Sequence, residues 1–233
     1  MAAIFKREFK SFFITPIGYV ILAIFLFFEG LFFSTMYYYG YADVTFVFDQ
    51  SFTLALVAIP IITMRLLSED RRQKTDQALF TAPVSITSIV LGKYFAALCL
   101  FMLAFAPTFI FQIIVSLYVD IGWLIYLGNL LGLLLFGGSI LAIGIFVSSL
   151  TESQIVAAIG SFAVSMLILM LDSVSSMIDN ATFTKIIESI SFSERYNSFV
   201  NGIFDYSNAI FFLSFIAVFL FLTIKVLDKR RYS

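Results

Sequence analysis

Long apolar runs separated by short polar segments divide the chain into six candidate membrane spans. A helix needs about 20 mostly apolar residues to cross the hydrocarbon core of a bilayer. The runs cover residues 16–38, 51–67, 88–117, 124–150, 154–171 and 208–227. The second and fifth runs are short, and the third and fourth are long enough to tilt or to extend past the membrane. The pattern predicts an all-α integral membrane protein with six transmembrane helices.

Basic residues fall in alternate gaps between these runs. Three precede the first run, five lie between residues 65 and 93, and four lie in the tail from residue 225. Only Lys185 and Arg195 fall on the other side when both termini share a side. Because Lys and Arg are enriched in cytoplasmic loops, the pattern predicts that both termini lie in the cytoplasm.

The composition agrees with a membrane as the solvent of this chain. The 233 residues are 61% hydrophobic and 12% charged, whereas soluble domains are about 45–50% apolar and about 25% charged. The mean hydropathy is +1.02. The first run is too long for a signal peptide, and no A-x-A-like site follows it. The chain has no histidine and one cysteine, Cys99, which excludes histidine-based catalytic sites and an intrachain disulfide.

Residues 1–15 predict an amphipathic helix in the cytoplasmic interface of the membrane. Apolar residues recur at helical spacing, and the basic residues fall between them. The apolar set is Ile4, Phe5, Phe9, Phe12 and Phe13, and the basic set is Lys6, Arg7 and Lys10. The alternative is a basic topology signal without a fixed structure.

The segment with the densest charge follows the second apolar run. Ser68 can cap a helix, and Glu69 and Asp70 would lie in its first turn, where the helix dipole favours acids. Pro83 ends the segment. Dense charges of alternating sign suit a docking surface for another protein, so residues 68–82 predict a short cytoplasmic helix. The alternative is a solvated loop that only fixes the topology.

This segment resembles the first intracellular loop of type-2 ABC exporter permeases. That loop reads approximately Met-Arg-x-x-Ser/Ala-Glu-Glu-Arg-x-x-Gly-Thr-x-Glu-x-Leu-x-Thr-x-Pro-Val. The chain matches it at Met64, Arg65, Ser68, Glu69, Arg71, Thr75, Leu79, Thr81, Pro83 and Val84. It departs from the pattern at Asp70, at Lys74 in place of Gly, and at Gln77 in place of Glu. The first residues, Phe-Lys-Arg-Glu-Phe-Lys-Ser-Phe-Phe, and the basic C-terminal end resemble the gliding-motility GldF-like branch.

The resemblance implies a role for each part of a single transmembrane domain over residues 1–233. Residues 68–82 would form a coupling helix in a cleft of a cytoplasmic ABC ATPase, and residues 1–15 an interface helix that also touches it. The implied coupling residues are Ser68, Glu69, Asp70, Arg71, Arg72, Lys74, Thr75 and Gln77. The implied interface residues are Phe5, Lys6, Arg7, Phe9 and Lys10.

The resemblance also implies the partners. They are a dimeric ATPase, a second or related permease copy, a GldG-like auxiliary subunit in some complexes, and membrane lipid; nucleic acid is not expected. The implied location is the bacterial cytoplasmic (inner) membrane. The chain has no G-x-x-x-x-G-K-[ST] loop to hold nucleotide phosphates. We therefore expect no enzymatic activity, no metal and no cofactor of its own, with ATP and Mg bound by the partner ATPase.

Three other features remain in the apolar runs and the longest loop. Glu29 is the one acid well inside a predicted span, where an ionised carboxylate costs several kcal/mol; it is a candidate pathway or gate residue, or a structural hydrogen-bonding group. Residues 172–207 predict short helices on the outer mouth of the bundle. A stripe of small residues in the fourth run predicts close packing within the chain, or, as an alternative, between two permease copies. The stripe is Gly128, Gly132, Gly137, Gly138 and Gly144.

The leading prediction is the permease subunit of an ATP-driven exporter. A second is a membrane anchor of an envelope or gliding-type ABC complex that transports nothing. A third is a secondary transporter or channel, which would need buried ionisable residues on broken helices. An intramembrane enzyme is the least favoured, because no convergent acid–base or metal cluster is evident in the sequence.

Overall fold

The computed structural model describes residues 1–41, 44–75, 84–119, 122–175 and 190–231, and the regular secondary structure in these ranges is α-helical. The helices are α1 Ala2–Ile14, α2 Pro16–Tyr38, α3 Thr45–Thr63, α4 Ser68–Arg72, α6 Ile86–Ala104, α7 Ala106–Ser116, α8 Trp123–Leu150, α9 Gln154–Ser175, α11 Phe192–Val200 and α12 Tyr206–Arg231.

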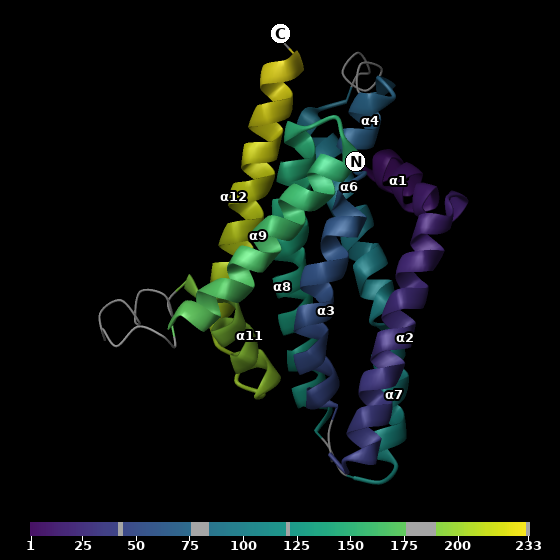
Figure 1. Ribbon diagram of the computed structural model, residues 1–233, viewed down its shortest axis with the longest axis vertical. Coiled ribbons are helices and arrows are strands. Elements are labelled where there is room, and N and C mark those ends of the chain that lie inside the picture. The colour runs from purple at the N-terminus through teal and green to yellow at the C-terminus, as the bar shows by residue number, and fades with distance from the viewer. Residues whose placement is uncertain (42–43, 76–83, 120–121, 176–189, 232–233) are drawn as a thin grey trace.

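Helices α2, α3, α8 and α12 run roughly along the long axis of the molecule, and α9 crosses them obliquely (Figure 1). The start of α1, the short helix α4, the start of α9 and the end of α12 lie at one end of the molecule, which we call the terminal end (Figure 1). The end of α2 and the start of α3 lie at the opposite end, which we call the far end (Figure 1). This arrangement places both ends of the described chain on the same side, as alternating basic loops require.

Five helical stretches in the described ranges are long and apolar enough to cross a membrane. They are Pro16–Tyr38, Thr45–Arg72, Ile86–Ser116, Trp123–Leu150 and Tyr206–Arg231. The predicted fifth run gives a shorter apolar helix, Gln154–Met170. Large apolar side chains are exposed on the outside of the bundle, such as Phe27 at 62% and Ile210 at 65%. These stretches are those of a multi-pass membrane protein, as predicted. The sixth predicted span is not confirmed, because the apolar part of α9 among the described residues is shorter than the other five.

The centre of the bundle is formed by α3 and α8. In Figure 1, α2 and α7 lie on one side of this pair, and α9, α11 and α12 lie on the other. The glycine stripe of α8 lets neighbouring side chains approach within the chain: Gly132 faces Phe199, Gly137 faces Phe101 and Gly144 faces Thr63. The prediction that the stripe serves packing inside one chain is confirmed at these positions.

The predicted third span is broken into α6 and α7. Phe105 leaves the helical conformation with ψ near 2°, because Pro107 has no N–H to donate and its ring clashes with the preceding turn. The Thr108 hydroxyl donates to the Phe105 carbonyl oxygen at 2.7 Å. This bond satisfies a carbonyl group at the break, as membrane helices with an internal proline require.

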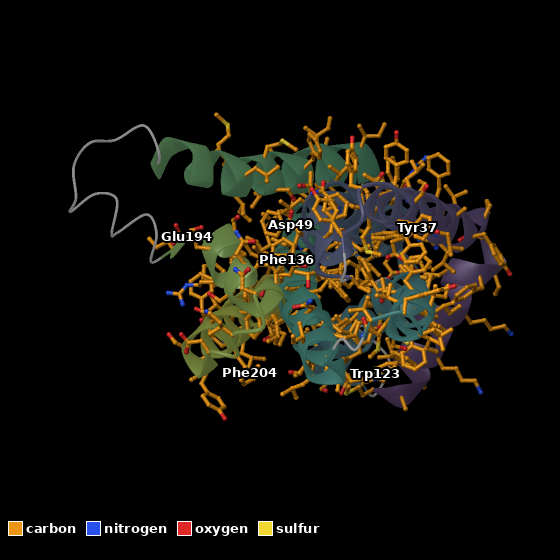
Figure 2. The ribbon with its side chains drawn as sticks, turned by 90° about the horizontal axis from the view of Figure 1, so that it is seen from below. Tyr37, Asp49, Trp123, Phe136, Glu194 and Phe204 are labelled. Carbon is orange, nitrogen blue, oxygen red and sulfur yellow. The ribbon has the colours of Figure 1, made fainter. Side chains whose placement is uncertain are left out.

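Helix α11 reaches deeper than the outer mouth at which short helices were predicted. Its residues Phe192, Tyr196, Phe199 and Val200 form a buried stripe at helical spacing. Tyr196 packs 5.5 Å from the ring of Phe136, near the middle of α8, and its hydroxyl donates to the Phe48 carbonyl at 2.6 Å. Seen from the far end, Phe136 lies toward the centre of the bundle and Phe204 at its edge (Figure 2). Residues 176–189 of this segment lie outside the described residues.

The contact between Gly144 and Thr63 predicts a steep size limit between α8 and α3. A Cβ at Gly144 would lie 2.8 Å from the Thr63 Cβ, whereas a Cβ at Gly128 would meet nothing within 4 Å. We expect Gly144→Ala to lower the stability of the detergent-purified chain by about 1–3 kcal/mol, because overpacking forces the helices apart. Gly128→Ala is the matched control and should leave the stability of the chain unchanged or raise it slightly. Thermal unfolding followed by size-exclusion chromatography measures both, and equal melting temperatures would contradict the packing.

Candidate functional site

Segments distant in sequence meet at the terminal end. Helix α1 packs along α6, and an added Cβ at Gly92 would lie 2.9 Å from the Ile4 side chain. The absence of a side chain at Gly92 therefore allows α1 to lie close against α6 at this point. Helix α4 follows α3 and lies near the start of α1 in Figure 1. Side chains from α1, the α3–α4 turn, α4 and α6 meet here and form the candidate site, which we call the charged cluster. Its residues are Arg7, Glu8, Ser11, Thr15, Arg65, Glu69, Asp70, Thr75 and Lys93.

Lys93 is the central residue of the charged cluster. It lies in the second turn of α6 and is 1% exposed. Its ammonium group lies 3.1 Å from Glu8 Oε1 on α1 and 2.7 Å from Asp70 Oδ2 on α4. A buried charge is tolerated when it is paired, so Lys93 holds α1 and α4 against α6.

Arg7 adds a second positive charge beside the same two acids. Its guanidinium lies 2.5 Å from Glu8 Oε1 and 3.8 Å from Asp70 Oδ2. Partial burial by itself lowers the pKa of Arg7, but the hydrogen bond to Glu8 and the negative charges of Glu8 and Asp70 raise it overall. The acids therefore stabilise two cations at the junction of α1, α4 and α6.

Arg65 makes a parallel connection between the end of α1 and α4. Its guanidinium donates to Thr15 Oγ1 at 2.8 Å and to Ser11 Oγ at 2.9 Å. Its Nε lies 3.2 Å from Glu69 Oε2, and its guanidinium stacks 5.5 Å from the ring centroid of Phe12. Arg65 is 8% exposed, so its guanidinium N–H groups bond to protein groups and have little contact with solvent.

Helix α4 is also fixed to α8 on its other side. The Ser148 hydroxyl accepts hydrogen bonds from the backbone N–H groups of Leu67 and Ser68, at 3.2 and 3.1 Å. It also lies 3.2 Å from the Met64 carbonyl, to which it can donate. These bonds satisfy N–H groups at the start of α4 that lack helical partners. The hydroxyl of Ser148 takes the role that the sequence assigned to Ser68, whose own hydroxyl donates to the Met64 carbonyl.

The helix predicted over residues 68–82 is interrupted after Arg72. Helix α4 has five residues and ends at Arg72. Lys74 has φ 56°, a left-handed conformation that glycine adopts at less cost than other residues. Thr75 Oγ1 then bonds back to Asp70 Oδ1 at 2.9 Å. The chain turns at Lys74, which is the position of glycine in the loop pattern of type-2 exporter permeases. Residues 76–83 lie outside the described part of the chain.

The structure separates the predicted coupling residues into an inner and an outer group. Glu69, Asp70 and Thr75 bond within the charged cluster, and Ser68 is buried. Arg71 lies 2.6 Å from Glu152 in the connection between α8 and α9. Arg72 and Lys74 are exposed. Gln77 lies outside the described residues.

The predicted interface residues show the same separation on α1. Phe5 and Phe9 are half-buried and stack with ring centroids 5.8 Å apart. Lys6 and Lys10 are exposed, and Arg7 joins the cluster. Glu29 lies elsewhere, fully buried in α2.

Several residues of the charged cluster were absent from the predicted site. They are Glu8, Ser11, Thr15, Arg65 and Lys93. Ser148 of α8, which bonds to the start of α4, was absent as well. Lys93 carried a usable signal, because a lysine just inside an apolar run is expensive unless an acid pairs with it. Ser148 had none, since hydroxyls are common in membrane helices. Among the described residues, no group of three or more acids or cysteines is placed to hold a metal.

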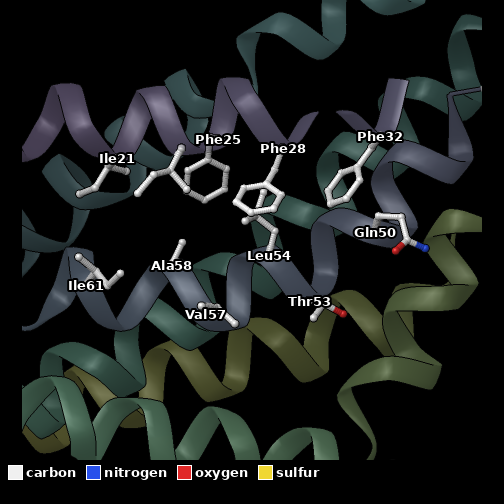
Figure 3. A pocket seen from close by; sticks show the side chains of 11 residues that line it. Ile21, Phe25, Phe28, Phe32, Gln50, Thr53, Leu54, Val57, Ala58 and Ile61 are labelled. Atoms are coloured by element: carbon white, nitrogen blue, oxygen red, sulfur yellow. The ribbon is translucent and has the colours of Figure 1, made fainter. Parts of the chain in front are cut away.

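A second feature is an apolar groove between α2 and α3 (Figure 3). It has a volume of about 390 Å³. Phe25, Phe28 and Phe32 line one wall, and Val57 and Ala58 line the other (Figure 3). Gln50 and Thr53 supply its polar groups near one end. The groove opens sideways from the bundle and is separate from the charged cluster.

Comparison with known proteins leaves the chain without an assigned family. No protein-family model matches it, and no curated protein is similar to it in sequence.

The pairing of Lys93 predicts a large effect of its removal. Lys93→Met would leave Glu8 and Asp70 without their buried partner, and breaking such a pair costs about 3–5 kcal/mol. Lys10→Met, on the exposed face of α1, is the control and should change stability by less than about 0.5 kcal/mol. Adding Glu8→Gln and Asp70→Asn to Lys93→Met should recover part of the loss. Thermal unfolding of the purified chain measures these differences, and similar melting temperatures for the two lysine variants would count against the pairing.

The left-handed turn predicts opposite effects of glycine at adjacent positions. We expect Lys74→Gly to raise stability by about 0.5–1 kcal/mol, because glycine adopts a positive φ without steric cost. Gln73→Gly is the matched control, since Gln73 has φ −87° and its amide bonds to Glu69. That variant should lower stability by about 0.5–1 kcal/mol. Protease susceptibility of the loop and thermal unfolding report the change, and a destabilising Lys74→Gly would refute the turn.

Proposed function

We propose that this chain is the transmembrane permease subunit of an ATP-driven ABC exporter, and that it receives movement from a separate cytoplasmic ATPase at its terminal end. The observation that carries the proposal is the charged cluster. It joins the amphipathic helix α1, the short helix α4 and the long membrane helix α6 through one buried ammonium group. The likeness of residues 64–84 to the coupling loop of type-2 exporter permeases supports the same proposal.

The cluster gives a path for force from the surface to the membrane. A partner that moves α4 pulls on Lys93 through Asp70, and on α1 through Arg65. Because Lys93 lies on α6, displacement of α4 is transmitted to a helix that continues through the break at Phe105 into α7. The hydrogen bonds of Ser148 transmit the same displacement to α8.

The distribution of charge defines the surface available to a partner. The acids Glu8, Glu69 and Asp70 turn inward, with side chains 13%, 29% and 19% exposed. The exposed charges of α1, α4 and the turn after α4 are mainly basic: Lys6, Arg7, Lys10, Arg72 and Lys74. Complementary potentials steer association and fix its register. We therefore propose an acidic cleft on the ATPase as the partner surface.

The rest of the assembly follows from this assignment. The terminal end faces the cytoplasm of a bacterial cell, and the spans cross the inner membrane. Two copies of the chain, or this chain and a related permease, form the pathway above an ATPase dimer, with an auxiliary GldG-like subunit as a further partner. We place the apolar part of the pathway at the groove between α2 and α3, since it extends about 16 Å along α2 from Ile21 to Phe32.

The proposed docking surface predicts a selective loss of ATPase binding. We expect Arg72→Glu with Lys74→Glu to reduce the amount of ABC ATPase that copurifies from native membranes at least tenfold, because like charges across an interface cost several kcal/mol. Lys229→Glu with Arg231→Glu makes the same charge change at two exposed positions of α12 at the same end, and should retain the ATPase. Quantitative mass spectrometry of the purified complexes measures both.

Two outcomes would argue against the proposal. Equal retention of the ATPase by both double variants would exclude docking on the α4 turn. An ATPase activity in the reconstituted complex that no cargo changes would favour a membrane anchor over an exporter. The comparison of the two double variants does not depend on unfolding, because both pairs of residues are exposed and lie outside the charged cluster.

A further inference from the structure

Glu29 is a buried acid that the charged cluster does not use. It is 0% exposed, and neither carboxyl oxygen has a hydrogen-bond partner among the described residues. It is the fourteenth residue of α2, so it lies about 20 Å along the helix from Pro16. A carboxyl group at this depth is surrounded by protein in a part of the bundle that crosses the membrane.

Two aromatic contacts fix the direction in which Glu29 points. One turn before it, Phe25 packs against Phe105 with ring centroids 5.2 Å apart. One turn after it, Phe33 stacks on Phe111 at 4.4 Å. Glu29 shares the face of α2 that carries these two rings, so it faces the first turns of α7, just beyond the break in the helix.

The first turns of α7 carry polar groups that are also buried. Thr108 Oγ1 lies 3.1 Å from the Tyr126 hydroxyl, and Tyr126 is within electrostatic range of Glu29. Gln112, one turn further along α7, is 1% exposed, and its Nε2 has no hydrogen-bond partner among the described residues. Thr108, Gln112 and Tyr126 are therefore buried polar residues on the side that Glu29 faces, and none of them is hydrogen-bonded to it. We call these four residues the interior polar site.

No described cation is placed to balance a negative charge at this site. Helix α7 has no ionisable residue, α3 has only the exposed Asp49 in its first turns, and the ionisable residues of α6 are Lys93, Tyr94 and Cys99, of which only Lys93 is a cation. Lys93 precedes Thr108 by 15 residues, which is about 22 Å along a helix. The charged residues of α1 lie at the terminal end as well. On α2 itself, the other ionisable groups are Tyr19, Tyr37 and Tyr38 near its two ends.

We propose that Glu29 is a proton-binding site, and that its carboxyl group is protonated and neutral in the folded chain. An ionised carboxylate that has no paired cation and accepts no hydrogen bond is too costly in this environment. A protonated carboxyl group removes the charge, and the hydroxyls and amide of the interior polar site suit a neutral acid. The inference concerns the interior of the bundle and does not depend on the ATPase or on the exporter assignment.

Carbodiimide labelling tests the protonation state directly. Dicyclohexylcarbodiimide adds the protonated carboxyl group across one C=N bond, and an O-to-N acyl shift gives a stable N-acylurea with no atom lost. We expect peptide mapping of the full-length chain, labelled at neutral pH in native membranes, to find this adduct on Glu29 and to find none at that position in Glu29→Gln. The exposed carboxylates Asp49 and Glu152 are internal controls. They should react instead with a water-soluble carbodiimide and glycine methyl ester.

The dependence of stability on pH gives a second measurement. The folded chain holds a proton at Glu29 that the unfolded chain releases at neutral pH, so folding binds a proton and stability falls as pH rises. An unfolded carboxyl group already loses its proton at mildly acidic pH. We therefore expect the melting temperature of the wild-type chain to fall more steeply than that of Glu29→Gln from mildly acidic pH upward. The pH dependence of the two chains should become similar only below the ordinary pKa of a carboxyl group.

Three results would overturn the proposal. The first is reaction of Glu29 with the water-soluble reagent, which would show a solvated carboxylate. The second is the absence of a dicyclohexylcarbodiimide adduct at Glu29. The third is a pair of parallel melting curves against pH for the wild type and Glu29→Gln. If Glu29→Gln fails to fold, the labelling of the wild-type chain still decides between a neutral acid and a solvated carboxylate.

Discussion

The arrangement of the terminal end depends on one buried ammonium group. Lys93 can be buried on α6 only if negative charge reaches it, and the nearest acids are on two other segments, Glu8 on α1 and Asp70 on α4. Both segments must fold back over the start of α6 to supply them. A buried ion pair adds little net stability over an apolar contact, but removal of one partner is costly. Lys93 therefore acts mainly as a constraint on where α1 and α4 can lie.

The positions of the membrane helices could be predicted from the sequence because hydropathy and length decide them. The break in the third span could not. Pro60 and Pro107 both lie inside apolar runs, yet α3 continues through Pro60 and the chain breaks at Phe105. At Pro60 the Thr63 hydroxyl bonds to carbonyls of the preceding turn without interrupting the helix. The difference depends on local packing, which single-sequence patterns do not contain.

The charges of residues 68–74 were enough to predict that this segment belongs to a site. Which of the charged side chains face the protein interior and which face outward could not be predicted. Residues 68–74 carry two acids followed by three bases, and this dense mixture of charges suggested one mixed docking surface. In the folded chain, Glu69 and Asp70 turn inward because Arg65 and Lys93 lie there. Lys93 is 23 positions from Asp70 and 85 from Glu8, so only the tertiary fold brings them together. Because these acids face inward, the outer surface is left mainly basic. The surface expected on the partner is therefore acidic instead of mixed.

Lys93 and Glu29 are buried ionisable groups at different depths, and the depth of each explains why their surroundings differ. Lys93 is the eighth residue of α6, about 10 Å from the start of that helix, and acids from α1 and α4 reach it from the membrane surface. Glu29 lies about 20 Å into α2, beyond the reach of any basic side chain anchored at the terminal end. An ion pair can neutralise the first group, whereas a proton is the simplest neutralising ligand for the second. Proton binding at Glu29 and ion pairing at Lys93 are thus two responses to the same cost of burying charge.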